Sequence, residues 1–449
     1  MNVALRYGRE GLAVSLPDEN LRHVLRFRPL PVIEDPRQAL AEALRRPIGG
    51  PPLRELAAGR RDVCLVTSDL TRPVPNRDLL PVMLSELQAA GLPPERVTVL
   101  LGTGLHRPST EAEVREMLGD EVLASGARVV NHVARDADAQ VCCGATARGT
   151  PVQVDRVYAE ADLRLSVSLV EPHLMAGFSG GRKAICPGVC GRETIRLFHG
   201  PWFLEPDEAC AGVLDGNPVH RECLDIVTLA GRPEFTVNVT LDEARRVTGV
   251  FAGEMEAAHL AAVERSAAQS KVAIPEPVDI VVTTNAGYPL DLTFYQGIKG
   301  MIAAVPILKP GGTIIIAHEC AEGLGSPEFS ELLMSVRDPE EYVAKTWDRS
   351  FYCVDQWQFH EHVKVMRRAG EILNLSRGIP DDQLAYCFVT PVASVEAAVA
   401  HALTRHGRDA SLAVIPEGPY VLACVEGDLI DRQRFGGGAA ELSGQGESR

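Results

Sequence analysis

Residues 62–101 read DVCLVTSDLTRPVPNRDLLPVMLSELQAAGLPPERVTVLL. The segment begins with a short apolar run, Asp62 to Thr67, continues with a helix-like stretch, Arg77 to Ala90, and ends with a second apolar run, Val97 to Leu101. A strand, a helix and a second strand in this order form the βαβ unit of a parallel sheet. This stretch therefore predicts an α/β fold.

The same alternation continues along the chain. In the first part we expect a helix at 111–118, strands at 128–131 and 163–170, an antiparallel pair at 235–239 and 246–251, and a helix at 255–268. Later apolar runs that repeat the α/β pattern are 280–284, 300–308, 313–317 and 385–389. The predicted fold class is α/β, with two domains whose mostly parallel sheets are flanked by helices.

The length of the chain, 449 residues, indicates two domains, because a single hydrophobic core rarely serves so many residues. Two prolines in the segment 270–277 mark an interdomain connection. We place an N-terminal domain at 1–273 and a C-terminal domain at 274–435. Residues 436–449 are rich in glycine and polar residues and are expected to form a flexible tail.

The composition indicates a small ligand as the partner. Sixty acidic and 45 basic residues give a net charge of −15, which opposes binding to nucleic acid. No apolar run is long enough to span a membrane and no targeting segment precedes the fold, so we expect a cytoplasmic protein. Eleven cysteines without repeated spacing are typical of reduced thiols. The oligomeric state stays open, a homo-oligomer included.

Reactive side chains follow the predicted strands. Asp69 follows the first strand, His106 the second, His173 the third and Asn285 the fourth. Open α/β sheets bind ligands beyond the carboxyl ends of their strands. Because these ends come from both predicted domains, we expect the active site in an interdomain cleft.

The turns after the first two of these strands carry side chains that could bind a carboxylate or transfer a proton. In the turn Asp69-Leu-Thr-Arg-Pro-Val-Pro75 the guanidinium of Arg72 could bind a carboxylate; the alternative is a turn whose Asp69 caps the following helix. In Gly102-Thr-Gly-Leu-His106 the imidazole could act as acid or base, or could simply lie on the surface.

The stretch Gly177-Phe-Ser-Gly-Gly-Arg-Lys183 could cradle a phosphate through its backbone amides, helped by Ser179 or Arg182. Ala184 follows the lysine, so the hydroxyl that a nucleoside triphosphatase needs for magnesium is missing. Lys183 could form a covalent or ionic bond to a cofactor. The alternative is an ordinary glycine turn with a surface lysine.

Two later segments add polar groups. His199 could ligate nickel, copper or zinc, or could cap the end of a helix. Tyr295 and Lys299 share one helix face, with Gln296 beside them, and could hold a carboxylate and a carbonyl oxygen together; a half-buried phenol with a solvated lysine is the alternative. His360 and His362 would point apart on a helix and are not expected to form a metal pair.

Five motifs in this order resemble the nickel-dependent lactate racemase family, and the resemblance covers most of the chain. The motifs are DLTRPVP at 69–75, GLHRP at 104–108, EPHLMAGFSGGRK at 171–183, FHG at 198–200 and YQGIKG at 295–300.

The resemblance implies a cofactor, the nickel-pincer nucleotide, a pyridinium-3-thioamide-5-thiocarboxylic acid mononucleotide that carries nickel. Lys183 would be its covalent anchor and His199 a nickel ligand. The residues that would hold the nucleotide are Asp69, Ser179, Gly180, Gly181 and Arg182. Cofactor-synthesis proteins would be the maturation partners.

The resemblance also implies the chemistry. His106 and His173 would be the paired acid/base residues, and the substrate would be bound by Arg72, Tyr295, Gln296, Lys299 and Trp357. A hydride would pass from C2 to the pyridinium and back through a bound 2-keto acid, with one histidine serving each enantiomer. The N-terminal domain would then anchor the cofactor and carry the acid/base residues, and the C-terminal domain would bind the substrate.

The expected substrates are short aliphatic 2-hydroxy acids, lactate and 2-hydroxybutyrate, because no third cation is assigned for a second carboxylate. A malate or sugar-acid racemase or epimerase with the same cofactor is the first alternative. A metal-dependent hydrolase or lyase that uses His106, His173 and His199 as ligands is the second, and a non-catalytic binding protein for a nucleotide or sugar acid is the third.

Overall fold

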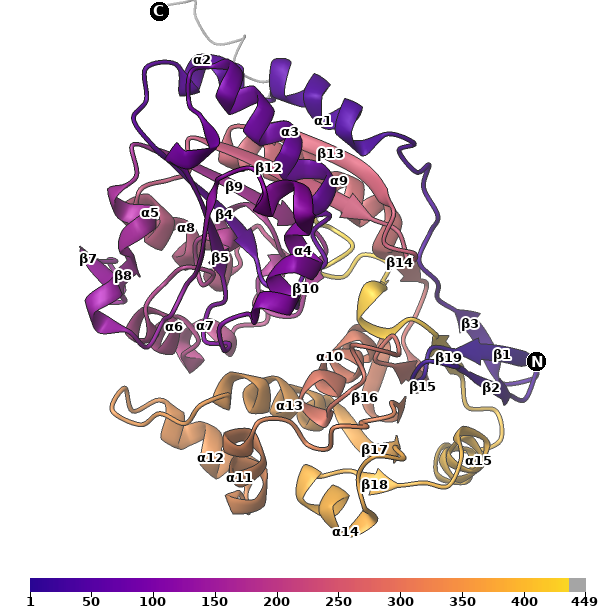
Figure 1. Ribbon diagram of the computed structural model, residues 1–449. Helices are drawn as coiled ribbons and strands as arrows, with labels where there is room; N and C mark the ends of the chain where they lie inside the picture. The colour runs from indigo at the N-terminus through magenta and orange to yellow at the C-terminus, as the bar shows by residue number, and fades with distance from the viewer. Residues whose placement is uncertain (436–449) are drawn as a thin grey trace, which may run out of the picture.

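The computed structural model describes residues 1–435. Figure 1 shows two lobes, each built around a six-stranded sheet. The first lobe holds the sheet β13-β12-β9-β4-β5-β6, whose neighbouring strands are parallel except for the antiparallel pair β12 and β13. Its strands are β4 (Val63–Ser68), β5 (Val97–Gly102), β6 (Arg128–Asn131), β9 (Leu163–Leu169), β12 (Phe235–Leu241) and β13 (Val247–Gly253).

The second lobe holds the sheet β18-β17-β16-β15-β19-β3, in which every neighbouring pair is parallel. Its strands are β3 (Leu21–Val24), β15 (Val278–Thr284), β16 (Leu308–Ala317), β17 (Ala369–Leu375), β18 (Thr390–Pro391) and β19 (Leu412–Ile415). The predicted α/β class with mostly parallel sheets is confirmed.

Helices cover both faces of the first sheet because its buried strands alternate their apolar side chains between the faces. Leu65 and Val99 pack in one cluster with the first four helices, whereas Val66 and Leu100 pack in another with the later ones. The first set is α1 (Pro36–Arg45), α2 (Leu53–Ala57), α3 (Asn76–Ala89) and α4 (Glu111–Leu123). The second is α5 (Arg156–Glu160), α6 (Arg192–Phe198), α7 (Pro201–Leu204), α8 (Pro218–Ala230) and α9 (Met255–Ser270).

The second sheet is covered in the same way. One face packs against α10 (Phe294–Ala304), α11 (Pro327–Ser335), α12 (Pro339–Thr346), α13 (Gln356–Arg368) and α14 (Asp381–Leu384). The other face packs against α15 (Val395–His406) and the hairpin of β1 (Asn2–Leu5) and β2 (Leu12–Ser15). Within residues 1–435, no helix combines the length and the apolar character needed to cross a membrane.

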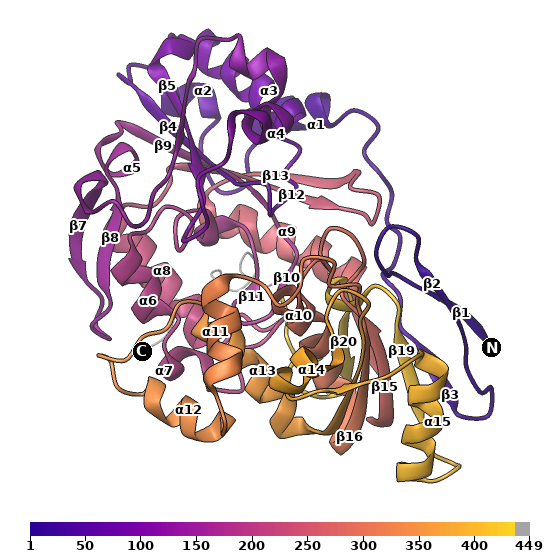
Figure 2. The same ribbon diagram turned by 60° about the horizontal axis from the view of Figure 1, so that its bottom comes forward.

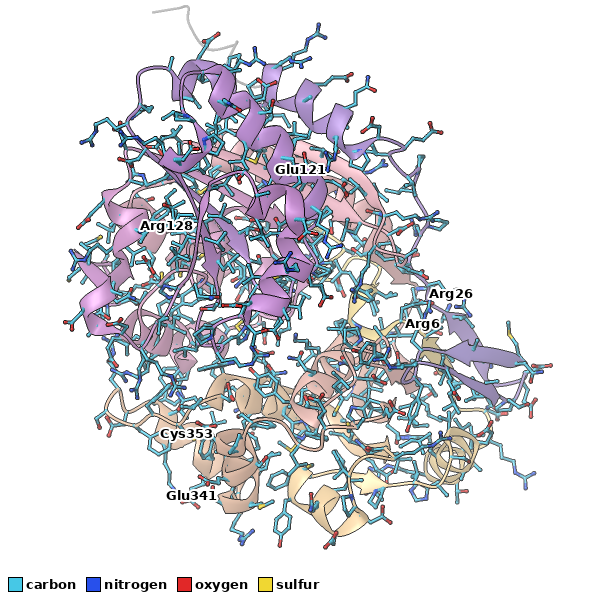
Figure 3. The ribbon with its side chains drawn as sticks, in the orientation of Figure 1. Arg6, Arg26, Glu121, Arg128, Glu341 and Cys353 are labelled. Atoms are coloured by element: carbon cyan, nitrogen blue, oxygen red, sulfur yellow. The ribbon has the colours of Figure 1, made fainter. Side chains whose placement is uncertain are left out.

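Three short strand pairs complete the described chain: β7 (Gln140–Ala145) with β8 (Pro151–Asp155), β10 (Pro172–His173) with β11 (Gly177–Phe178), and β14 (Lys271–Ile274) with β20 (Leu422–Val425). The β14–β20 pair and α9 share an apolar cluster with Phe178 of the first lobe. The start of the chain also contacts the first lobe, since Arg6 pairs with Glu243 in the β12–β13 turn at 3.3 Å. Figure 3 labels Arg6 beside Arg26, close to β3.

Sheet pairing does not follow the predicted domain ranges at the start of the chain. β3 pairs with β19 of the second sheet, so residues 1–25 belong structurally to the second lobe although the prediction assigned 1–273 to the first domain. The sequence of a four-residue strand does not indicate which distant strand it pairs with. The boundary near residue 273 stays a prediction, and the predicted tail, 436–449, lies outside the described residues.

Most predicted elements of the first lobe are present, and two apolar runs of the second lobe differ from the expectation. The run 300–308 ends α10 and continues as a 3-10 turn, and the run 385–389 contains a 3-10 turn. A short apolar run fits a buried helix as well as a buried strand, so periodicity could not separate them.

Gly300 lets α10 lie directly on β15, because a Cβ built on it would lie 2.1 Å from the backbone oxygen of Thr284. We expect Gly300→Ala to lower the free energy of unfolding by about 1–3 kcal/mol, the usual cost of overpacking a core. Chemical denaturation followed by circular dichroism would measure the change. Gly50→Ala is the matched control, since its nearest foreign atom lies 3.9 Å away. Equal stability of both variants would contradict the close packing of α10.

Candidate functional site

A cavity of about 1450 Å³ is lined by residues from both lobes. Its first-lobe residues follow the carboxyl ends of β4, β5 and β9, as expected for a parallel sheet. Its second-lobe residues come largely from α10, α13 and nearby loops, and Figure 2 shows α10 beside β10 and β11. The predicted site residues that line the cavity are Asp69, Arg72, His106, His173, Ser179, Gly180, Lys183, His199, Tyr295, Gln296, Lys299 and Trp357.

His106 and Asp69 form a hydrogen-bonded pair. Nδ1 of His106 lies 2.7 Å from Oδ2 of Asp69, and the Thr71 hydroxyl donates to the other carboxylate oxygen at 2.5 Å. Burial raises the pKa of Asp69, but the hydrogen bonds from His106 and Thr71 outweigh burial and hold the pKa below its usual value. Asp69 is therefore ionised and orients the ring so that Nε2 carries the free lone pair. Asp69 also lines the cavity, and its expected contact with a nucleotide stays a prediction.

His173 is buried in the β10–β11 hairpin, opposite Gly177. Gly177 has a φ of 74°, and a Cβ there would lie 2.2 Å from the backbone oxygen of Val213, so the hairpin requires glycine. Burial lowers the pKa of His173 well below its usual value, and the positive charges of Lys183, Arg72, Lys299 and Arg182 lower it further. The imidazole is therefore neutral at physiological pH.

Lys183 is partly buried and lines the cavity without a side-chain hydrogen bond or ion pair among residues 1–435. Burial lowers its pKa to about 8, and the charges of Arg182 and Arg72 act in the same direction. A substantial fraction of the amine is therefore neutral and nucleophilic near pH 7 to 8.

His199 is a buried imidazole that is prepared to act as a ligand. Its Nδ1 donates to the backbone oxygen of Ile195 at 2.9 Å, which leaves the Nε2 lone pair free. Burial lowers its pKa to about 4, so the ring is neutral. The Trp357 ring packs against it with centroids 4.9 Å apart. A neutral imidazole with a fixed tautomer is the form that binds a metal.

The two cations predicted to bind a carboxylate differ in their partners. Arg72 forms an ion pair with Glu171, a partner that the sequence analysis did not assign. Lys299 is partly buried on α10 without an ion pair in the described chain, and desolvation lowers its pKa to about 8, with Arg72 adding to the effect. Lys299 is therefore the cation whose charge a substrate carboxylate would compensate.

Tyr295 and Gln296 bring further polar atoms to the cavity. The Tyr295 hydroxyl accepts a hydrogen bond from Nε1 of Trp357 at 3.1 Å. The Gln296 side-chain oxygen is buried and has no hydrogen-bond partner among the described residues. An unpaired buried amide oxygen beside a cavity indicates a ligand that donates a hydrogen bond. The predicted clustering of Tyr295, Gln296 and Lys299 is present in α10.

The turn at 177–182 is mainly a support for Lys183. The Ser179 hydroxyl donates to the backbone oxygen of Leu169 at 2.8 Å and the Gly181 amide donates to Asn238 at 2.9 Å. Arg182 is buried and donates to the backbone oxygen of Ala176 at 2.7 Å. Gly181 and Arg182 are not among the residues that line the cavity, and their expected contact with a phosphate stays a prediction.

The three histidines do not form a metal site by themselves. Within the described part of the chain, no three His, Cys, Asp or Glu side chains are grouped closely enough to hold a metal ion. His360 and His362 separate as expected on α13: His360 contacts Glu205 at 3.0 Å, whereas His362 contacts the backbone oxygen of Cys387. The geometry gives no support to the alternative of a three-histidine hydrolase.

Comparisons with known proteins decide the family. Residues 7–211 match the lactate racemase N-terminal domain, and residues 273–423 match the lactate racemase C-terminal domain. The chain belongs to the lactate racemase family. A lactate racemase from Thermoanaerobacterium thermosaccharolyticum is 33% identical over 94% of this chain and 99% of the relative. A lactate racemase from Lactiplantibacillus plantarum is 34% identical over 86% of this chain and 90% of the relative.

The solved structures agree. The lactate racemase apoprotein from Thermoanaerobacterium thermosaccharolyticum superposes with a TM-score of 0.88 at 32% identity, covering 94% of this chain and all of that one. The predicted family and the predicted two-lobed α/β fold are therefore confirmed, and membership of the lactate racemase family makes the chain an isomerase.

Three acidic residues of the cavity received no role from the sequence. Glu171 was quoted within a motif but received no role, although it pairs with Arg72. Asp355 lines the cavity two residues before Trp357, and Glu205 follows α7 and accepts from His360 and Arg367 of the second lobe. The position of Asp355 next to a predicted pocket residue was the only sequence signal for it.

Lys183 should titrate well below an ordinary lysine. We expect competitive labelling with acetic anhydride, read by mass spectrometry, to give a midpoint near pH 8 in the folded protein and near 10.5 in denaturant. Between these values the unfolded chain binds a proton that the folded chain does not, so this lysine makes stability rise with pH across that window. The same midpoint in both states would contradict burial of the amine.

Proposed function

We propose that this chain racemises short-chain aliphatic 2-hydroxy acids, with lactate as the first substrate and 2-hydroxybutyrate as the second, in the cleft between its lobes. One observation carries the proposal: in a chain of this family, a single cavity is lined by Lys183, His199, His106 and His173. Lactate as substrate is supported by the names of both relatives.

The residues fit the nickel-pincer nucleotide that the family resemblance implies. Lys183 is a partly buried amine without a partner in the described chain and with a lowered pKa, as suits a covalent anchor. The free Nε2 of His199 suits nickel, a metal for which imidazole is a good ligand. Ser179 and Gly180 line the same cavity. When bound, this group would accept a hydride from C2 of the substrate and return it.

The chain itself would bind and orient the substrate. The ammonium of Lys299 would pair with the carboxylate, assisted by Arg72, whose guanidinium is shared with Glu171. The unpaired oxygen of Gln296 would accept a hydrogen bond from another donor of the bound ligand. Tyr295 and Trp357, which are hydrogen-bonded to each other, would form one wall of the substrate pocket.

The two imidazoles would move the hydroxyl proton. Asp69 fixes Nδ1 of His106 as a donor, so Nε2 of His106 can take the proton from a hydroxyl. His173, held neutral by burial and by four nearby cations, can serve the other enantiomer. Removing the hydroxyl proton while hydride leaves C2 avoids a carbanion beside a carboxylate, and the resulting 2-keto acid is planar.

Lys183→Ala should lose the covalent cofactor. We expect intact-protein mass spectrometry of protein made with a cofactor-synthesis system to show an adduct and near-stoichiometric nickel in the wild type and neither in the variant. Lys345→Ala is the matched control, because Lys345 lies exposed on α12 and pairs only with Glu341. An adduct that survives Lys183→Ala would overturn the anchor.

Asp69→Asn should slow racemisation of lactate by about 10- to 1000-fold, because general acid–base catalysis typically contributes 10²–10⁴-fold and the variant removes the carboxylate that orients His106. Steady-state racemisation of L-lactate by cofactor-loaded protein would measure the loss. Thr71→Val, which keeps the carboxylate and removes one of its donors, should cost far less. If Asp69→Asn retains full rate, Asp69 does not orient the base.

A further inference from the structure

We propose that Asp355 is a specificity-determining residue, whose carboxylate restricts the site to 2-hydroxy acids with an uncharged side chain and excludes dicarboxylates such as malate. This inference rests on the proposed function and names the substrate class for the same site. It is carried by the backbone of Asp355, by the contacts of its side chain and by the distribution of charge around the cavity.

The backbone at Asp355 is held in an uncommon conformation. Asp355 has φ 65° and ψ 9°, the left-handed region that residues other than glycine, asparagine and aspartate rarely adopt. It occupies the N-cap position of α13, where an aspartate normally accepts hydrogen bonds from the first turn of the helix. Here no such bond is made. The carboxylate is therefore turned away from the helix that it would ordinarily stabilise.

The carboxylate is instead held at the cavity wall. The Ser326 hydroxyl donates to Oδ2 of Asp355 at 2.7 Å, and the neighbouring Tyr295 hydroxyl lowers the pKa of Asp355 against the larger effect of burial. Trp357 in turn donates to that Tyr295 hydroxyl at 3.1 Å. Asp355 therefore lies near two residues proposed to form one wall of the substrate pocket. Its orientation is thus fixed rather than free to turn to solvent.

No cation pairs with this carboxylate within residues 1–435, in contrast to Glu171 and Glu113, which pair with arginines. Burial raises the pKa of Asp355, and the neighbouring Glu328 adds to the effect, whereas Ser326 and the charge of His106 oppose it. Asp355 and His106 both line the cavity, and a further negative charge beside the unpaired carboxyl group of Asp355 would be unfavourable.

Charged groups of both signs line the cavity. Lys183, Arg72 and Lys299 are its cations near His173, whereas Asp355 lies two residues before Trp357, whose ring packs against His199. A substrate whose C1 carboxylate binds Lys299 and whose hydroxyl lies between the histidines has its C3 end left for the side of Asp355. A methyl or ethyl group at C3 is tolerated there, but a second carboxylate would meet a like charge without a counterion.

Arg135 is the rival feature, because it lines the same cavity, is exposed, and has no ion pair in the described chain. Its charge acts on Tyr352, on which the charge of Asp355 also acts. If Arg135 received the second carboxylate of malate, the site would be a dicarboxylate site. The experiment therefore includes both side chains.

The test uses cofactor-loaded wild type and the variants Asp355→Asn, Asp355→Gly, Glu328→Gln and Arg135→Ala. Asparagine and glycine both tolerate the left-handed backbone, so the fold should persist in at least one of the two. Racemisation of L-lactate and L-malate is followed for each, and calorimetry measures the binding of both acids. Glu328→Gln is the matched control, because it removes a nearby carboxylate that also lines the cavity and is exposed.

We expect the wild type to favour lactate strongly and Asp355→Asn to raise the ratio of kcat/KM for malate to that for lactate at least tenfold, mainly through a lower KM for malate. Glu328→Gln should change the ratio less than threefold. An unchanged ratio in both Asp355 variants, or wild-type turnover of malate that is lost in Arg135→Ala, overturns the proposal. If the loaded wild type racemises neither acid, the proposed function fails, and relative binding of lactate and malate alone then decides the role of Asp355.

Discussion

The site depends on one constraint: the carboxyl ends of β4, β5 and β9 meet at one edge of a parallel sheet, and the second lobe covers that edge. Polar side chains placed there are withdrawn from water by α10 and α13. Two lysines and two histidines that would be charged or weakly basic in solution therefore have lowered pKa values. These lowered pKa values depend on the packing around the side chains more than on the local sequence.

The hydrogen bonds around the imidazoles differ, and each difference suits a role. His106 is half-exposed and is oriented by the ionised Asp69, whereas His199 is buried and is oriented by a backbone oxygen. A carboxylate partner favours a ring that gains a proton, and a backbone oxygen favours a ring that stays neutral. Under the proposed function, the same residue type would serve proton transfer at one place and metal ligation at another.

The sequence predicted the fold class well where the signal was local. The run 62–101 gave the strand, helix and strand at their observed places, and motif order identified the family. It could not reveal that β3 joins the second sheet, because the sequence of a four-residue strand does not indicate which distant strand it pairs with. It also could not show that Arg182 turns behind the cavity or that Arg72 is shared with Glu171, because side-chain direction is set by tertiary packing.

The pairing of β3 with β19 bears on the order in which the chain folds during synthesis. Leu21 lies opposite Leu412, so the edge strand of the second sheet is made early and cannot be paired until nearly all of the described chain has left the ribosome. The first sheet needs only residues up to β13 and can form as soon as these have emerged. During that interval Lys183 and His199 stand on a formed lobe that the second has not yet covered. Translation thus provides a period in which the groups on the first lobe are open to a bulky ligand before the enclosing half is complete.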